Sequence, residues 1–156
     1  MNTQPTPAIK APERPRRVRP ARLSLSGLFA IGTGGMVGVL ARYGIGRAWP
    51  AAPRKFPWST LAINLSGSLL LGVVVTLVIE RWPPTRYVRP FAGVGVCGGY
   101  TTWSTFMTEV ALLVRDHRTS IAVTYVAVTM AAGLAATYAG IGLARLWPVE
   151  ATRRST

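Results

Sequence analysis

Four long stretches of the chain contain no Asp, Glu, Lys or Arg, and this absence constrains the fold more than any other feature. The stretches cover residues 23–41, 56–79, 90–108 and 119–144, and they are 19, 24, 19 and 26 residues long. About 20 apolar residues in a helix are enough to cross the hydrocarbon core of a bilayer. The pattern therefore predicts an all-α integral membrane protein with four transmembrane helices.

The distribution of charge favours a membrane protein over a nucleic-acid-binding protein. The formal net charge is +13, and only 15% of the residues are charged, where soluble domains carry about 25%. A nucleic-acid-binding module would place its basic residues on one folded face, often among aromatic side chains. Here the basic residues are excluded from the uncharged stretches and gathered between them. We therefore expect a lipid membrane around the chain and no nucleic-acid partner.

Helix boundaries follow from the uncharged stretches and from the prolines between them. The predicted helices cover residues 24–47, 59–81, 85–115 and 119–146. Prolines interrupt the first and second loops, where they are typical of turns. Because only a short charged loop joins the last two helices, those helices should be antiparallel neighbours.

The basic residues also bear on the orientation of the chain. Residues 23–147 form the predicted transmembrane domain, between a disordered basic tail at 1–22 and a short polar tail at 148–156. The side with both termini carries twelve Lys and Arg and the other side six, but without residues 1–22 each side carries six. Since Lys and Arg favour the cytoplasmic side, the tail alone favours an N-terminus inside the cell.

The third predicted helix contains a segment that is a poor continuous helix. Gly93, Gly95, Gly98 and Gly99 precede the run Thr-Thr-Trp-Ser-Thr-Phe. One interpretation is that the glycines only allow close packing between helices. The alternative is a break near the middle of the helix, which a membrane tolerates where the backbone is buried in protein or lines a cavity. The carbonyl groups of such a break can coordinate a cation. The polar run after the glycines favours the break.

Three ordered motifs resemble those of one known family. Residues 98–106 (GGYTTWSTF) resemble the GGxTTFSTF signature of the small Fluc (CrcB-type) fluoride ion channels. Residues 59–67 (STLAINLSG) resemble the GTLxVNxxG segment of that family, and residues 34–43 (GGMVGVLARY) its GGxxGxxxRy segment. The order and spacing agree over roughly residues 25–146, so the chain is identified as a member of this family.

The resemblance implies a fluoride-specific channel of the cell membrane that exports fluoride passively and is not an enzyme. It implies an antiparallel, dual-topology dimer with two fluoride pores and a central structural Na⁺ that is not transported. By position, backbone carbonyls of Gly98 and Thr101 from both subunits would hold the sodium. The pore residues implied in the same way are Asn64, Trp103, Phe106, Tyr125 and Thr129.

The chemistry of these side chains agrees with anion conduction. Asn64 offers an amide NH₂, and Ser104, Thr105, Tyr125 and Thr129 offer hydroxyl groups, all uncharged donors. Each residue also has a structural alternative: Asn64 can join helices through hydrogen bonds, Tyr125 can anchor at the membrane surface, and the aromatic rings can serve packing. Arg42, near the end of the first helix, can raise the anion concentration in a vestibule or extend to lipid headgroups.

Three departures from the family pattern affect these expectations. Trp103 replaces the usual first Phe of the TTFSTF segment, which puts pore width and the competence of that pore in question. Gly133 stands one turn after Thr129, where the family often has another hydroxyl. The basic tail favours a single orientation. The partner in the dimer is therefore either a second copy or an oppositely oriented paralogue.

Two other functions are alternatives to a fluoride channel. A small multidrug-type cation/proton transporter of the four-helix class would need a carboxylate inside the membrane. Glu109 is the one acid near a predicted span, and the sequence does not decide whether it lies at a pore mouth or a helix end. A non-conducting structural subunit would not need the ordered polar residues of the last three helices. No nucleophile–base pair or metal-ligating cluster suggests an enzyme.

Overall fold

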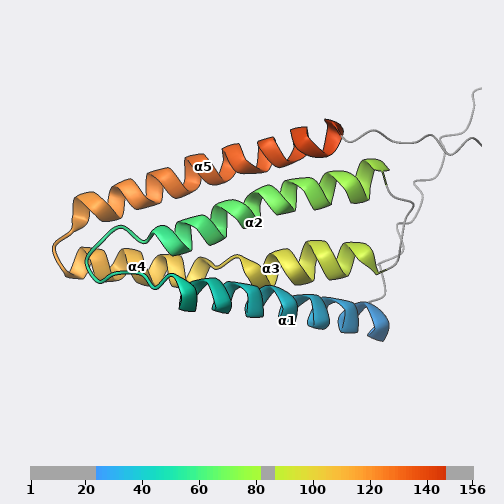
Figure 1. Ribbon diagram of the computed structural model, residues 1–156, viewed down its shortest axis with the longest axis horizontal. Coiled ribbons are helices and arrows are strands. Elements are labelled where there is room, and N and C mark those ends of the chain that lie inside the picture. The colour runs from blue at the N-terminus through green and yellow to red at the C-terminus, as the bar shows by residue number, and fades with distance from the viewer. Residues whose placement is uncertain (1–23, 82–86, 147–156) are drawn as a thin grey trace, which may run out of the picture.

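The computed structural model describes residues 24–81 and 87–146, and all regular structure in them is helical. The segments lie side by side in a bundle (Figure 1). Helix α2 continues into a π-helical turn, η1, and the third segment consists of η2, α3 and α4. The bounds are α1 Leu25–Ala48, α2 Trp58–Thr76, η1 Leu77–Arg81, η2 Arg89–Val96, α3 Cys97–Tyr100, α4 Trp103–Arg115 and α5 Thr119–Leu146.

These bounds confirm an all-helical chain with a divided third segment. Helix α5 has the predicted bounds, and α1 differs from its prediction by one residue at each end. Three helices are long and apolar enough to cross a membrane, namely α1, the helix over Trp58–Glu80, and α5. The third segment is interrupted between Tyr100 and Trp103 and forms no single span of that length. Residues 82–86 and the two predicted tails lie outside the described residues.

Glycines bring α2 and α5 into backbone contact. A Cβ on Gly72 would clash with the carbonyl oxygen of Thr137, and a Cβ on Gly140 would clash with that of Leu69. Small residues that allow close approach are typical of helix interfaces in membranes, where lipid removes most of the hydrophobic driving force. The two glycines therefore fix the contact between these helices.

Helix α1 packs in the same way against η2 and α3. Gly34 faces the backbone at Phe91, and Gly38 faces the backbone from Val96 to Tyr100. The two glycines of the Gly98–Gly99 pair have different surroundings. Gly99 packs closely against the backbone of Gly35, whereas a Cβ on Gly98 would meet open space. Close packing and a break in the helix are thus combined in one segment.

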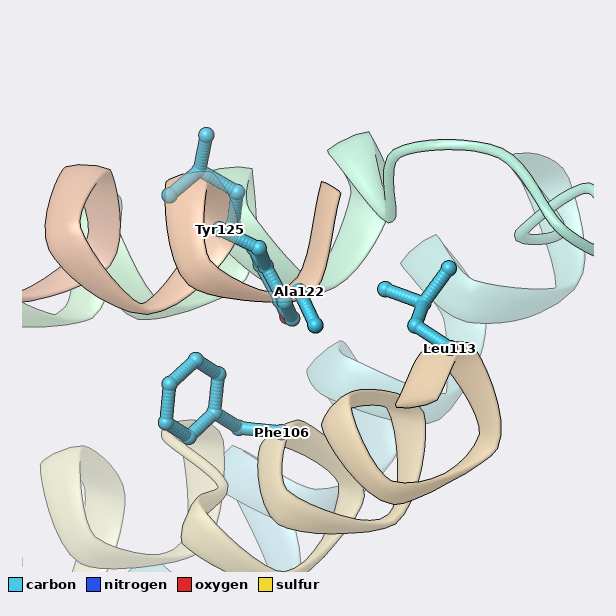
Figure 2. Packing of buried hydrophobic residues seen from close by; sticks show 5 residues of the cluster. Phe106, Leu113, Ala122 and Tyr125 are labelled. Carbon is cyan, nitrogen blue, oxygen red and sulfur yellow. The ribbon is translucent and has the colours of Figure 1, made fainter. Parts of the chain in front are cut away.

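A small apolar core lies at one end of the bundle, between α4 and α5. Phe106 and Leu113 from α4 face Ala122 and Tyr125 from α5, and all four side chains are buried (Figure 2). Large apolar side chains elsewhere point outward; Phe29 is 70% exposed and Leu40 is 68% exposed. Such an exposed apolar surface is expected for helices that contact lipid.

An ion pair joins neighbouring segments at each end of the bundle. Arg54 in the loop between α1 and α2 lies 3.3 Å from Asp116 in the loop between α4 and α5. At the opposite end, Arg145 near the end of α5 lies 2.7 Å from Glu80 in η1. Each pair joins an exposed arginine to a carboxylate that is at least partly exposed, so each contributes modestly to stability. The Arg54–Asp116 pair joins the loops 49–57 and 116–118, which lie at the same end of the bundle (Figure 1).

The glycine contact between α2 and α5 predicts a position-specific loss of stability. Gly140→Ala should lower the free energy of unfolding by about 1–3 kcal/mol, because its methyl group would overlap the backbone of α2. Gly142→Ala, two residues further along, meets no atom within 4 Å and should be neutral or slightly stabilising. SDS-induced unfolding in detergent micelles, followed by circular dichroism, measures the difference. Equal effects at the two positions would contradict the proposed packing.

Candidate functional site

A cavity of about 660 Å³ opens beside the break in the third segment. Its wall comes from α2, η2, α3, α4 and α5, and it contains no charged side chain. Six of the predicted site residues line it: Asn64, Gly98, Thr101, Trp103, Phe106 and Thr129. The structure therefore brings together most of the residues that the motifs had placed in three separate helices.

A second cavity of about 430 Å³ also adjoins the break. Arg42 and Thr105 line it, and Thr102 lines both cavities. Two predicted residues, Ser104 and Tyr125, line neither cavity. Ser104 is exposed on α4, and Tyr125 is fully buried in the small core. The predicted pore set is thus divided among the two cavities, the core and, for Ser104, the exposed surface of α4.

The break consists of two extended residues held by one side chain of α2. Thr101 and Thr102 have ψ angles of 156° and 119°, between the end of α3 and the start of α4. The amide of Asn64 binds both backbone polar groups of Thr102: Oδ1 accepts from the N–H at 2.9 Å, and Nδ2 donates to the carbonyl at 3.1 Å. Because buried backbone groups need partners, Asn64 makes this break tolerable at membrane depth.

The same side-chain bonds leave two carbonyl groups without their helical partners. In a continuous helix the N–H of Thr102 would bind the carbonyl of Gly98, and the N–H of Thr105 would bind that of Thr101. Instead, Asn64 takes the first N–H, and the side-chain oxygen of Thr102 accepts the second at 3.2 Å. Among the described residues, no hydrogen bond ends on these two carbonyl oxygens. They are the carbonyls that the motif had assigned to a cation.

The broken helix also places two partial charges near the middle of the segment. The helical run from Arg89 to Tyr100 ends at the break, and its C-terminal end carries partial negative charge. Helix α4 begins just after the break with Thr102 as its N-cap, and its first N–H groups carry partial positive charge. A cation is favoured on the first side and an anion on the second.

Two aromatic side chains of α4 border the cavity in different environments. Trp103 is 64% exposed, whereas Phe106 is 1% exposed. Their ring centroids lie 5.3 Å apart at 50°, and Phe106 meets Tyr125 edge to face at 4.9 Å. Phe106 is therefore held rigidly between the core and the cavity, and Trp103 stands at the open side of the single chain.

One cluster of residues was not predicted from the sequence. Both carboxylate oxygens of Glu109 accept hydrogen bonds, from the hydroxyl of Thr60 at 2.7 Å and from the hydroxyl of Tyr125 at 2.8 Å. The cluster joins α2, α4 and α5 next to the apolar core. The signal in the sequence is that Glu109 follows Phe106 by three residues and therefore shares its helix face.

The hydroxyl group of Thr129 is the buried side-chain polar atom that lacks a partner in the described part of the chain. Thr129 is 5% exposed and lines the first cavity. A buried hydroxyl without a hydrogen bond costs free energy, and such a group in a native fold usually serves a ligand, a water molecule or an ion. Thr129 is therefore the strongest indication that the cavity receives a hydrogen-bond acceptor.

Comparison with known proteins assigns the chain to a family. The model of the CrcB-like protein family, described as Camphor Resistance (CrcB), matches residues 29–141. Fluoride-specific ion channel FluC 2 from Nocardia farcinica is 43% identical over 140 residues, which cover 90% of this chain and 98% of the relative. Fluoride-specific ion channel FluC from Chlorobaculum tepidum is 38% identical over 123 residues, covering 79% of this chain and 98% of its own.

A further relative is similar over a smaller share of its own length. Fluoride-specific ion channel FluC 3 from Streptomyces avermitilis is 42% identical over 126 residues, which are 81% of this chain and 62% of the relative. The matched region of the family model contains the break, both cavities and every predicted site residue.

The hydrogen bonds of Asn64 predict that it stabilises the fold as well as the cavity wall. Asn64→Ala should lower the free energy of unfolding by about 1–3 kcal/mol, because it leaves two buried backbone groups of Thr102 without partners. Thr108→Ala is the control, since this exposed hydroxyl binds only its own helix; it should change stability by less than about 0.5 kcal/mol. Unfolding in SDS–detergent mixtures compares the two. An unchanged Asn64→Ala protein would show that another group holds the break.

Proposed function

This chain belongs to the CrcB-like family, and from that membership we propose that it is a fluoride-specific ion channel. It is a multi-pass protein of the cell membrane that lets fluoride leave the cell down its gradient and so lowers cytoplasmic fluoride. The observation that carries the proposal is the buried, unpartnered hydroxyl of Thr129 in the wall of an uncharged cavity.

The donors of this cavity suit a small anion. Fluoride is strongly hydrated, so a pore has to replace water with hydrogen-bond donors without holding the ion too tightly. Nδ2 of Asn64 donates one hydrogen to the backbone carbonyl of Thr102 and has a second hydrogen available. With Thr129, it offers two uncharged donors to an ion in the cavity. The edge of the Phe106 ring adds a weakly positive surface beside them.

Two further regions extend this path. Trp103 borders the cavity, and its indole contributes one more N–H donor. Arg42 lines the second cavity with Thr105, and its positive charge raises the local anion concentration there. Ser104 is exposed on α4, and its hydroxyl oxygen lies 3.4 Å from that of Thr102, a residue that lines both cavities.

A structural sodium ion fits the freed carbonyl groups at the break. Carbonyl oxygens are suitable ligands for a hard cation, and those of Gly98 and Thr101 have no hydrogen-bond donor among the described residues. The negative end of the helical run before the break also favours a cation there. The ion supplies fixed positive charge near the anion path and is not transported.

We propose that the channel is complete only as an antiparallel dimer, in which both subunits supply the sodium ligands. The large exposed fraction of Trp103 in the single chain, 64%, supports a partner that covers this side. The partner is either a second copy of the chain or an oppositely oriented paralogue. Proton-coupled cation transport has less support, because the wall of the first cavity holds no carboxylate and both oxygens of Glu109 are bonded to hydroxyl groups.

Fluoride efflux from liposomes tests the function directly. Liposomes that contain the purified protein and are loaded with fluoride should release it when the membrane potential is dissipated, as measured by a fluoride electrode. Liposomes loaded with chloride are the control and should release it no faster than protein-free liposomes. Efflux that requires co-expression with a paralogue would identify a heterodimer. Equal fluoride and chloride fluxes would contradict the proposed selectivity.

Removing the hydroxyl of Thr129 should lower fluoride efflux without lowering the stability of the protein. Thr129→Val keeps the shape of the side chain and removes an unpartnered hydroxyl, so the free energy of unfolding should not fall. Fluoride efflux should drop about tenfold or more, because a donor to a charged ion is lost. Thr124→Val, on the same helix, removes an exposed hydroxyl that binds Ser120, and should keep normal efflux. Unchanged efflux in Thr129→Val would remove this residue from the pore.

A further inference from the structure

The polar face of α5 has a gap inside the first cavity. Residues 125, 129, 133 and 137 are spaced by four and share one face of the helix, yet position 133 is a glycine. Thr137 does not fill the gap, because its hydroxyl donates to the carbonyl of Gly133 at 3.1 Å and is turned onto its own helix. A path that followed α5 alone would therefore lose its donors one turn after Thr129.

Ser68 of α2 lies opposite this gap. A Cβ on Gly133 would lie 3.7 Å from the side-chain oxygen of Ser68, which is the one atom within 4 Å of it. Ser68 follows Asn64 by four residues, so both lie on the same face of α2. Both line the first cavity together with Gly133 and Thr129.

The hydroxyl group of Ser68 is uncommitted. Several hydroxyl groups within these helices donate to a backbone carbonyl of their own helix, as those of Thr33, Ser66, Thr76, Thr108 and Thr124 do. The hydroxyl of Ser68 takes part in no such bond and in no other hydrogen bond among the described residues. In this it resembles the hydroxyl of Thr129 in the same cavity.

We propose that Ser68 is a fluoride-binding residue, and that its hydroxyl on α2 replaces the one that α5 lacks at Gly133. The proposal rests on the proposed fluoride channel and extends it. Asn64 and Thr129 supply the first donors, and Ser68 continues the path by one helical turn. Gly133 leaves the space that the ion occupies between the two helices. Each donor is uncharged, so the ion can pass from one to the next without being trapped.

The first arm of the test removes the hydroxyl group. Ser68→Ala should lower fluoride efflux from liposomes about tenfold or more, with an unchanged elution profile and thermal transition. Ser66→Ala is the matched control, since its hydroxyl binds the carbonyl of Ala62 and the hydroxyl of Tyr100 outside the cavity. Ser66→Ala should retain wild-type efflux.

The second arm moves the hydroxyl to the other helix. Gly133→Ser in the Ser68→Ala background should recover most of the efflux, because a side chain at 133 has room and reaches the same point. Gly133→Ala in that background should recover none. Normal efflux in Ser68→Ala, or equal efflux with Ser and Ala at position 133, would overturn the role of Ser68 while leaving the channel intact. Absence of efflux in the wild-type protein would overturn both proposals.

Discussion

The break at Thr101–Thr102 governs the rest of this structure, because a membrane interior offers no water to an unpaired backbone group. Two N–H groups at the break are taken up by the side chains of Asn64 and Thr102. The carbonyls of Gly98 and Thr101 thereby lose their helical partners, and both residues line the first cavity. The side chains that bind the free N–H groups thus leave free carbonyl oxygens, which are available to a cation. The amide of Asn64 therefore both stabilises the break and exposes part of the proposed sodium site.

The polar groups around the break divide into committed and uncommitted ones. The hydroxyls of Thr60 and Tyr125 donate to Glu109, and this cluster holds three helices together beside the apolar core. The hydroxyls of Ser68 and Thr129 have no hydrogen bond among the described residues, and both lie in the first cavity. Only uncommitted donors can exchange water for an ion at low cost, since committed ones would first have to break a bond. Tyr125 is therefore better placed to fix Phe106 than to contact the ion itself.

The sequence predicted the helices well and the site less completely, for physical reasons. The bounds of α5 follow from the uncharged stretch and its charged ends, because the bilayer sets the length. The break lies two residues beyond the glycine pair, since Gly99 is needed for packing on α1 and the extended residues are those that Asn64 can reach. That partner is 38 residues away in the chain, so no local pattern could place it. The Glu109 cluster and the pairing of Ser68 with Gly133 depend on contacts between helices in the same way.

The open side of the first cavity and the charges at the ends of the bundle both favour the proposed antiparallel partner. Trp103 presents a large, exposed indole beside freed carbonyls, and neither group suits direct contact with lipid tails. Each end of the described bundle carries an ion pair, Arg54–Asp116 at one and Glu80–Arg145 at the other. Outside residues 1–22, the two predicted sides of the membrane carry six Lys and Arg each, so neither end is strongly marked as cytoplasmic. In the proposed antiparallel dimer, each subunit would cover the polar side of the other with its own polar side. An equal number of Lys and Arg on both sides of the membrane domain permits the two opposite orientations, which a strong excess on one side would oppose.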